Sequence, residues 1–106
     1  MSGTVKQAIT NAFTMKVNTV SNTALAISNA SWSWGSTDLS TAVKAVISAN
    51  AKSIVATFDG TDPTTTLGLP IAEGASLSID GNLNIQNMKL IRATGDDATV
   101  TIILWK

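Results

Sequence analysis

Residues 54–64 have the sequence Ile-Val-Ala-Thr-Phe-Asp-Gly-Thr-Asp-Pro-Thr, a strand that runs directly into a sharp turn. Ile54, Ala56 and Phe58 share one side of an extended chain, because side chains alternate between the two faces of a strand. The valine and threonine between them are β-branched, which also favours a strand. Since both sides are largely apolar, we expect this strand to be covered on both faces or to lie in the middle of a sheet.

The strand ends in a turn that its residue types specify. Gly60 tolerates a positive φ, and Asp59 can accept a hydrogen bond from its own downstream backbone. Pro63 fixes φ and pushes Asp62 away from the helical region. A calcium loop is the alternative for the two carboxylates, but the further oxygen ligands at graded spacing are missing. We therefore interpret Asp59, Gly60, Asp62 and Pro63 as structural turn residues and predict no metal site.

The length and charge of the chain indicate one small domain that associates with other molecules. The sequence has 106 residues, of which 13% are charged, and its seven basic residues are balanced by seven acidic ones. Soluble proteins usually carry about 25% charged residues, and a net charge near zero favours association. No basic stripe is available to displace counterions from a nucleic acid, so we expect no nucleic-acid partner.

Two residue types that carry much of protein chemistry are missing. Without cysteine the chain forms no disulfide or thiolate metal site, and without histidine it lacks the commonest general base and metal ligand. No other set of side chains makes a workable active site, so we predict a protein that is not an enzyme and has no cofactor. No apolar run approaches the roughly 20 residues of a membrane span, and no signal segment is visible. We expect synthesis in the cytoplasm and no membrane partner.

Short alternating segments separated by turn residues recur along the chain, which is typical of an all-β domain. The expected strands are 13–19, 24–27, 42–48, 54–58, 76–80, 83–85, 88–93 and 98–106. Pro70 places the segment around it at a sheet edge or in a loop. The sequence therefore predicts a small antiparallel β-sandwich or jelly-roll-like domain of about 7–8 strands over residues 13–106. An N-terminal arm or short helix over residues 1–12 precedes it.

Two of these segments carry finer expectations. In the first, Phe13, Met15 and Val17 alternate with polar residues, so we expect them to point into the core. Leu39–Ile47 fits either the apolar stripe of a helix or a strand. Short connections between neighbouring strands are common, which favours a hairpin from residues 42–48 into the central strand.

Three regions supply apolar candidates for contact with a partner. Trp32 and Trp34 would form a sugar platform or a protein hot spot if exposed, but we favour a role as caps of the core beneath a loop, because tryptophans are mostly buried. Trp105 lies on the second apolar face of the last strand, which needs cover from another sheet or from a partner. Val5 and Ile9 recur at helical spacing in the arm, which would be a flexible arm or a short docked helix, or would reach a neighbouring subunit.

The second half of the chain, residues 43–105, resembles small virion proteins of tailed bacteriophages. The resemblance lies in residues 58–64, 69–74, 75–80, 85–93 and 98–105. It implies a non-enzymatic structural protein of the virion, most simply a capsid decoration or cement protein, with a tail, neck or head-fibre protein as the alternative. It also implies a homo-oligomer whose partners are other virion proteins, such as the major capsid protein or tail and neck proteins.

The turn at residues 59–64 also resembles a turn of small immunoglobulin-like modules that are appended to chitobiase-type glycosidases. This second resemblance implies a carbohydrate-associated binding module in which Trp32 and Trp34 are the sugar platform. Such modules usually lie within much longer secreted chains, so the virion protein is the leading hypothesis. An assembly chaperone or inhibitor is a third alternative that the sequence does not separate from the first.

Overall fold

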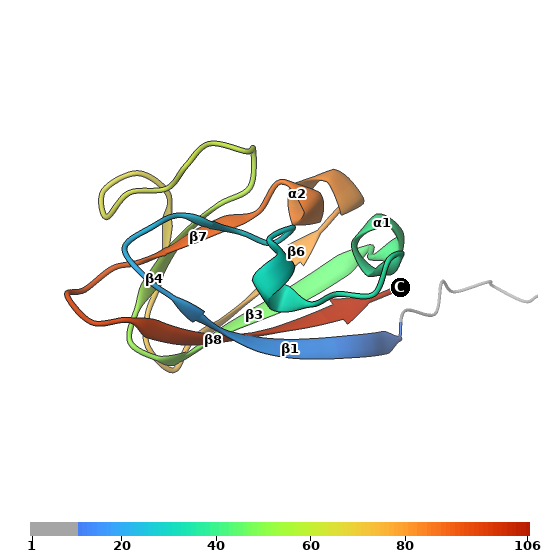
Figure 1. Cartoon of the computed structure of the whole chain (residues 1–106), viewed down its shortest axis with the longest axis horizontal. Helices are drawn as coiled ribbons and strands as arrows, with labels where there is room; N and C mark the ends of the chain where they lie inside the picture. Colours follow the sequence, from blue (N-terminus) through green and yellow to red (C-terminus); the bar gives the residue numbers. More distant parts are fainter. Residues whose placement is uncertain (1–10) are drawn as a thin grey trace, which may run out of the picture.

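The computed structural model describes residues 11–106 and confirms the all-β prediction. In this part of the chain eight strands form two antiparallel four-stranded sheets, which pack against each other (Figure 1). Sheet A has the strand order β1-β8-β3-β6, and sheet B has the order β2-β7-β4-β5. The elements are β1 Ala12–Val20, β2 Leu25–Ala26, η1 Ala30–Trp32, α1 Asp38–Thr41, β3 Lys44–Ala51, β4 Ile54–Thr57, β5 Leu69–Ile71, β6 Ser76–Asp80, α2 Asn82–Gln86, β7 Lys89–Arg92 and β8 Ala98–Trp105.

One apolar core holds the two sheets together. Sheet A contributes Ile47, Ile102 and Leu104, and sheet B contributes Ile54 and Leu90, all of them fully buried. Along β3 and β8 buried residues alternate with half-exposed ones, as a sheet with one face on the core requires. Most of the predicted N-terminal arm, with Val5 and Ile9, lies outside the described residues.

The central strand is confirmed. Every residue of β4 is buried, and β4 lies between β7 and β5. Ile54 and Ala56 belong to the core, while the loop that follows β4 folds back over the other face, so that a Cβ atom on Gly68 would lie 2.6 Å from Cγ1 of Val55. Pro70 is in β5, an edge strand, as its missing donor predicts.

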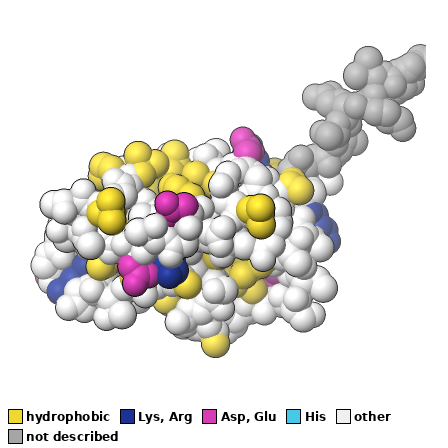
Figure 2. Space-filling model, turned by 90° about the horizontal axis from the view of Figure 1, so that it is seen from above, with side chains coloured by type: hydrophobic (Ala, Val, Ile, Leu, Met, Phe, Trp, Pro, Cys, Tyr) yellow, Lys and Arg dark blue, Asp and Glu magenta, His cyan; other side chains and the backbone are white. Residues whose placement is uncertain are grey.

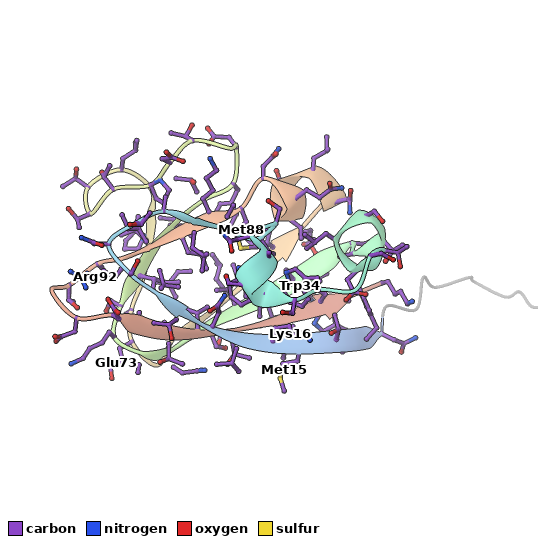
Figure 3. All side chains as sticks on the ribbon, viewed as in Figure 1. Met15, Lys16, Trp34, Glu73, Met88 and Arg92 are labelled. Atoms are coloured by element: carbon purple, nitrogen blue, oxygen red, sulfur yellow. The ribbon has the colours of Figure 1, made fainter. Side chains whose placement is uncertain are left out.

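The predicted orientation of β1 is wrong beyond its first residues. Phe13 packs against the core, but Met15 and Val17 are 60% and 59% exposed. The reason is a shift of register between Ala12 and Thr14, because an extra residue in one strand exchanges the faces of all side chains that follow it. Figure 3 shows Met15 pointing away from the sandwich.

The expected hairpin between β3 and β4 does not form. The chain does turn sharply, with Lys52 at φ 67°, but β3 belongs to sheet A and β4 to sheet B. The short connection therefore crosses from one layer to the other instead of pairing its neighbours. Leu39–Ile47 is divided: a one-turn helix, α1, ends at Thr41, and β3 begins at Lys44.

The expected strand at residues 83–85 is wrong as well. This segment is the short helix α2, in which Ile85 is fully buried and Leu83 is 73% exposed. Apolar residues two positions apart form a strand only where a neighbouring strand is available to hydrogen-bond to the segment. Here Gly81, with φ 96°, ends β6 and turns the chain into a helix instead.

Trp32 and Trp34 close one end of the core. Trp32 in η1 is 1% exposed, and its ring stacks on that of Trp34 with centroids 5.7 Å apart. The indole N–H of Trp34 donates a hydrogen bond of 3.0 Å to the carbonyl of Ile27. Asn18 fastens the same segment to β1 by donating to Oγ of Ser31 at 2.9 Å. The loop thus covers the inner side of β1.

Candidate protein-contact surface

Sheet A has a second face, directed away from sheet B, which we call the outer face. Residues opposite each other on antiparallel strands share a face, so the register gives its rows directly. One row runs from Met15 through Ile103 and Val46 to Ser78, across all four strands of the sheet. The next row consists of Val17, Thr101, Ser48 and Ser76.

The outer face is apolar and hydroxyl-bearing, with very little charge. The third row places Trp105 beside Lys44 and Asp80, the charged residues of these rows. Nζ of Lys44 lies 5.7 Å from the centroid of the Trp105 ring, so the ammonium group covers the indole. Figure 2 shows the molecule from above the view of Figure 1, the side opposite to that at which Met15 points in Figure 3, and this surface is also mostly uncharged. The arrangement suits burial against another protein, because few charges would lose water.

The structure places the predicted contact residues in different regions. Trp105 lies on the outer face and is half-buried. Trp32 is in the core, so only Trp34 of the pair retains exposed surface. Val5 and Ile9 lie outside the described residues.

Sequence reasoning missed Met15 and Val17 as members of the outer face. Alternation alone assigns them to the core, and nothing in the residue types around Phe13 reveals the register shift. One signal in the sequence did point to this surface, namely the apolar second face of the last strand. Ile103 and Trp105 of that strand lie beside β1 on the outer face.

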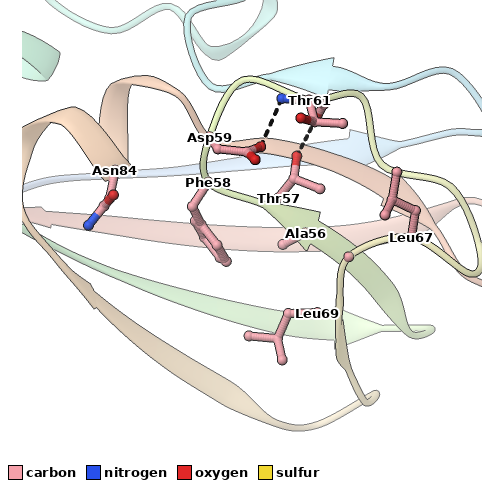
Figure 4. A pocket seen from close by; sticks show the side chains of 9 residues that line it. Ala56, Thr57, Phe58, Asp59, Thr61, Leu67, Leu69 and Asn84 are labelled. Carbon is pink, nitrogen blue, oxygen red and sulfur yellow. Dashed lines mark hydrogen bonds between the residues drawn. The ribbon is translucent and has the colours of Figure 1, made fainter.

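The predicted turn residues have structural partners. Gly60 has φ 87°, and the backbone N–H of Thr61 donates to Oδ1 of Asp59 at 3.0 Å. Asp62 accepts a hydrogen bond of 2.8 Å from Nζ of Lys89, and Pro63 is buried. The hydroxyl of Thr57 also donates to the carbonyl of Thr61, which ties the turn to the end of β4 (Figure 4).

The Asp59 turn makes a prediction for pH. The Thr61 N–H holds the pKa of the Asp59 carboxyl below its usual value, because the bond favours the ionised form. Its contribution to stability is therefore complete above the unfolded pKa of about 3.9 and is lost as pH falls through the lower folded pKa. We expect Asp59→Asn to be less stable than the wild type at pH 7, by a margin that shrinks in acid. Urea unfolding of both proteins at pH 7 and in acid measures the difference in stability, and a difference that does not depend on pH would contradict the prediction.

An open groove lies beside this turn. It has a volume of about 460 Å³ and is lined mainly by apolar side chains, among them Phe58, Leu67 and Leu69 (Figure 4). Asp59 is the titratable residue in its lining, and its carboxylate is already bonded to Thr61. The groove therefore offers apolar surface without a pair of groups for acid–base chemistry.

The remaining ionisable groups are dispersed. Within residues 11–106, no three acidic side chains gather in a way that would hold a metal ion. The ion pairs Lys52–Asp96, Lys89–Asp62 and Arg92–Asp97 lie at the surface, where such pairs contribute little to stability. In the same part of the chain, no helix has the length and apolar character needed to cross a membrane.

No family model matches the sequence, and no curated protein matches it either. The outer face of sheet A is thus the surface on which a functional interpretation can be built.

Proposed function

We propose that this chain is a non-catalytic structural protein of a bacteriophage particle, most simply a capsid decoration or cement protein. It acts by contact, and the outer face of sheet A is its contact surface. A place in the tail, neck or head fibre is the alternative within the same class. The observation that carries the proposal is the apolar row Met15, Ile103 and Val46, which crosses adjoining strands of a sheet that carries little charge on this side.

The size of the outer face suits a contact of modest strength. Strands about 4.8 Å apart that rise about 3.3 Å per residue give this four-stranded sheet a flat area of about 500 Å². Burying it against an equal area removes about 1,000 Å², near the lower bound for a specific interface. Such a contact holds more firmly when copies are joined to one another, because linked copies bind a particle multivalently.

The composition supports the same role. A protein that meets other subunits over a broad face gains from few charged groups, since each buried charge must be desolvated. The balanced charge of this chain leaves no long-range repulsion between copies that lie close together on a particle. The resemblance of residues 43–105 to small phage virion proteins points in the same direction.

The test is binding to particles that lack the protein. We expect the purified wild-type chain to co-sediment with them, and Val46→Glu to weaken binding at least about tenfold, because it buries a carboxylate in the contact. The matched control is Leu83→Glu, which introduces the same charge at a 73% exposed residue of α2. A wild-type chain that ignores particles, or equal binding by both variants, would overturn the proposal.

A further inference from the structure

We propose that the open edge of β1 pairs with β1 of a second copy of this chain, antiparallel and about a twofold axis at Val17. The two copies would then share one continuous sheet built from both sheets A. The inference goes beyond the proposed contact with a particle, and it names the strand, the register and the symmetry of a contact between copies.

Of the sheet edges in the described chain, β1 is the one suited to strand addition. The edge strand β2 has 2 residues, β5 has 3 and contains Pro70, and β6 has 5. β1 has 9 residues and forms the border of sheet A (Figure 1). Natural proteins protect edges by short strands, prolines, bulges and charged side chains. β1 is long and has no proline, its register shift lies before Thr14 at one end, and Lys16 is its one charged residue.

The hydrogen bonds at the strand ends show which backbone groups of β1 point outward. Lys106 exchanges bonds of 2.8 and 2.9 Å with Asn11, on the β1 side of β8, whereas the carbonyl of Trp105 accepts from Val43, on the β3 side. Backbone groups alternate in direction along a strand, so Leu104 and Ile102 also face β1.

The β1 residues opposite these β8 residues direct their own N–H and C=O groups toward β8. Thr14 is opposite Leu104 and Lys16 is opposite Ile102. The N–H and C=O groups of Met15, Val17 and Thr19 are therefore directed away from β8. Consistent with this direction, the N–H of Thr19 is bonded to Oδ1 of Asn18 at 2.8 Å rather than within the sheet.

The outward groups and Lys16 together select one register. A twofold axis at Val17 places Val17 opposite its own copy and Met15 opposite Thr19 of the second copy. The N–H groups of Met15 and Val17 in both copies then find carbonyl acceptors. An axis at Lys16 would also give these N–H groups acceptors, because it pairs Met15 with Val17, but it would place two ammonium groups directly opposite each other, which is destabilising.

The side chains agree with this register. Met15 and Val17 are exposed and uncharged on the outer face, and both gain cover when a second strand lies beside them. Lys16, the charged residue of β1, lies on the other face and would be opposite Asn18 of the second copy. The amide oxygen of Asn18 accepts from the Thr19 N–H and has a second lone pair for the ammonium group. Pairing also extends the apolar row of the outer face across the dimer.

Sedimentation equilibrium of the full chain tests the proposal with a proline variant. We expect the wild type to be in a concentration-dependent monomer–dimer equilibrium. Val17→Pro removes an N–H that the monomer does not use, so it should fold normally and raise the dimer Kd at least about tenfold. Val17→Thr keeps the N–H and should change the Kd less than threefold. A monomer at all concentrations, an assembly larger than a dimer, or unchanged dimerisation of Val17→Pro overturns the proposal.

A cysteine pair tests the register even if the proline variant folds poorly. The chain has no cysteine, so one substitution introduces a unique thiol. Opposed residues on antiparallel strands have Cα atoms about 5.5 Å apart, within disulfide range. We expect oxidation of Val17→Cys to link most of the protein into dimers. In Thr19→Cys the two thiols would be about 13 Å apart, so it should link at least about tenfold less. Equal linking of both variants overturns the register.

The two proposals fail in different experiments. If Val17→Pro is monomeric but still binds particles, the strand pairing is separate from attachment, and both proposals stand. If the wild type dimerises through Val17 but ignores particles, the proposed function fails and the pairing stands.

Discussion

Replacing Trp32 by alanine is expected to lower the free energy of unfolding by about 3–5 kcal/mol. The indole is the largest fully buried side chain of the described residues, and it joins η1 to the core. Its removal leaves a cavity and also withdraws the stacking partner of Trp34. Urea denaturation at neutral pH, followed by circular dichroism, measures the loss.

The control for Trp32 is Leu83→Ala, in which the side chain removed is 73% exposed. It should change the free energy of unfolding by no more than about 0.5 kcal/mol. If Trp32→Ala costs less than about 1 kcal/mol, the cavity has been filled by movement of the loop, and η1 does not seal the core. That result would also mean that Trp32 is not essential to the core, and it would again be a candidate for contact with a partner.

The second large effect is expected at Gly68. Its φ of 132° is unfavourable for any residue with a Cβ, and the added atom would lie 2.6 Å from Cγ1 of Val55 and 2.8 Å from the carbonyl oxygen of Ala56. Strain and overlap together should make Gly68→Ala about 2–4 kcal/mol less stable. Thermal and urea unfolding of the purified variant measure this.

Two other glycines separate the causes. Gly74 has φ 84° with nothing within 4 Å of an added Cβ, so Gly74→Ala reports strain alone, about 1–2 kcal/mol. Gly95 has open space and an ordinary φ, so Gly95→Ala should be within about 0.5 kcal/mol of the wild type. Equal effects at Gly68 and Gly74 would show that the loop does not press on β4.

Close packing at Gly68 explains how a short strand can be buried on both faces. β4 has the core on one side and its own returning loop on the other. The same loop forms the open groove beside Phe58. A destabilised loop would therefore alter the groove while leaving the outer face of sheet A unchanged, which keeps stability tests at Gly68 apart from binding tests at Val46.

Local sequence patterns determined the fold class, most strands and the central turn. Alternation in β3, β6 and β8 follows from the pleat of a strand, and the Asp59-Gly60 turn follows from residues that accept its backbone angles. The scarcity of charge, and the lack of cysteine and histidine, are properties of composition. These features depend on residues close together in the chain, so they can be predicted without knowledge of the rest.

Only the tertiary structure decided which faces are exposed and which strands are neighbours. The register shift near Phe13 turned Met15 and Val17 outward, β3 and β4 went to different sheets, and residues 83–85 became a helix. Each outcome depends on residues far along the chain. The orientation of β1 depends on its pairing with β8, and the other two outcomes depend on which sheet the segment packs against. The candidate surface arises from that pairing, because a change of one residue in register exchanges every side chain between core and solvent.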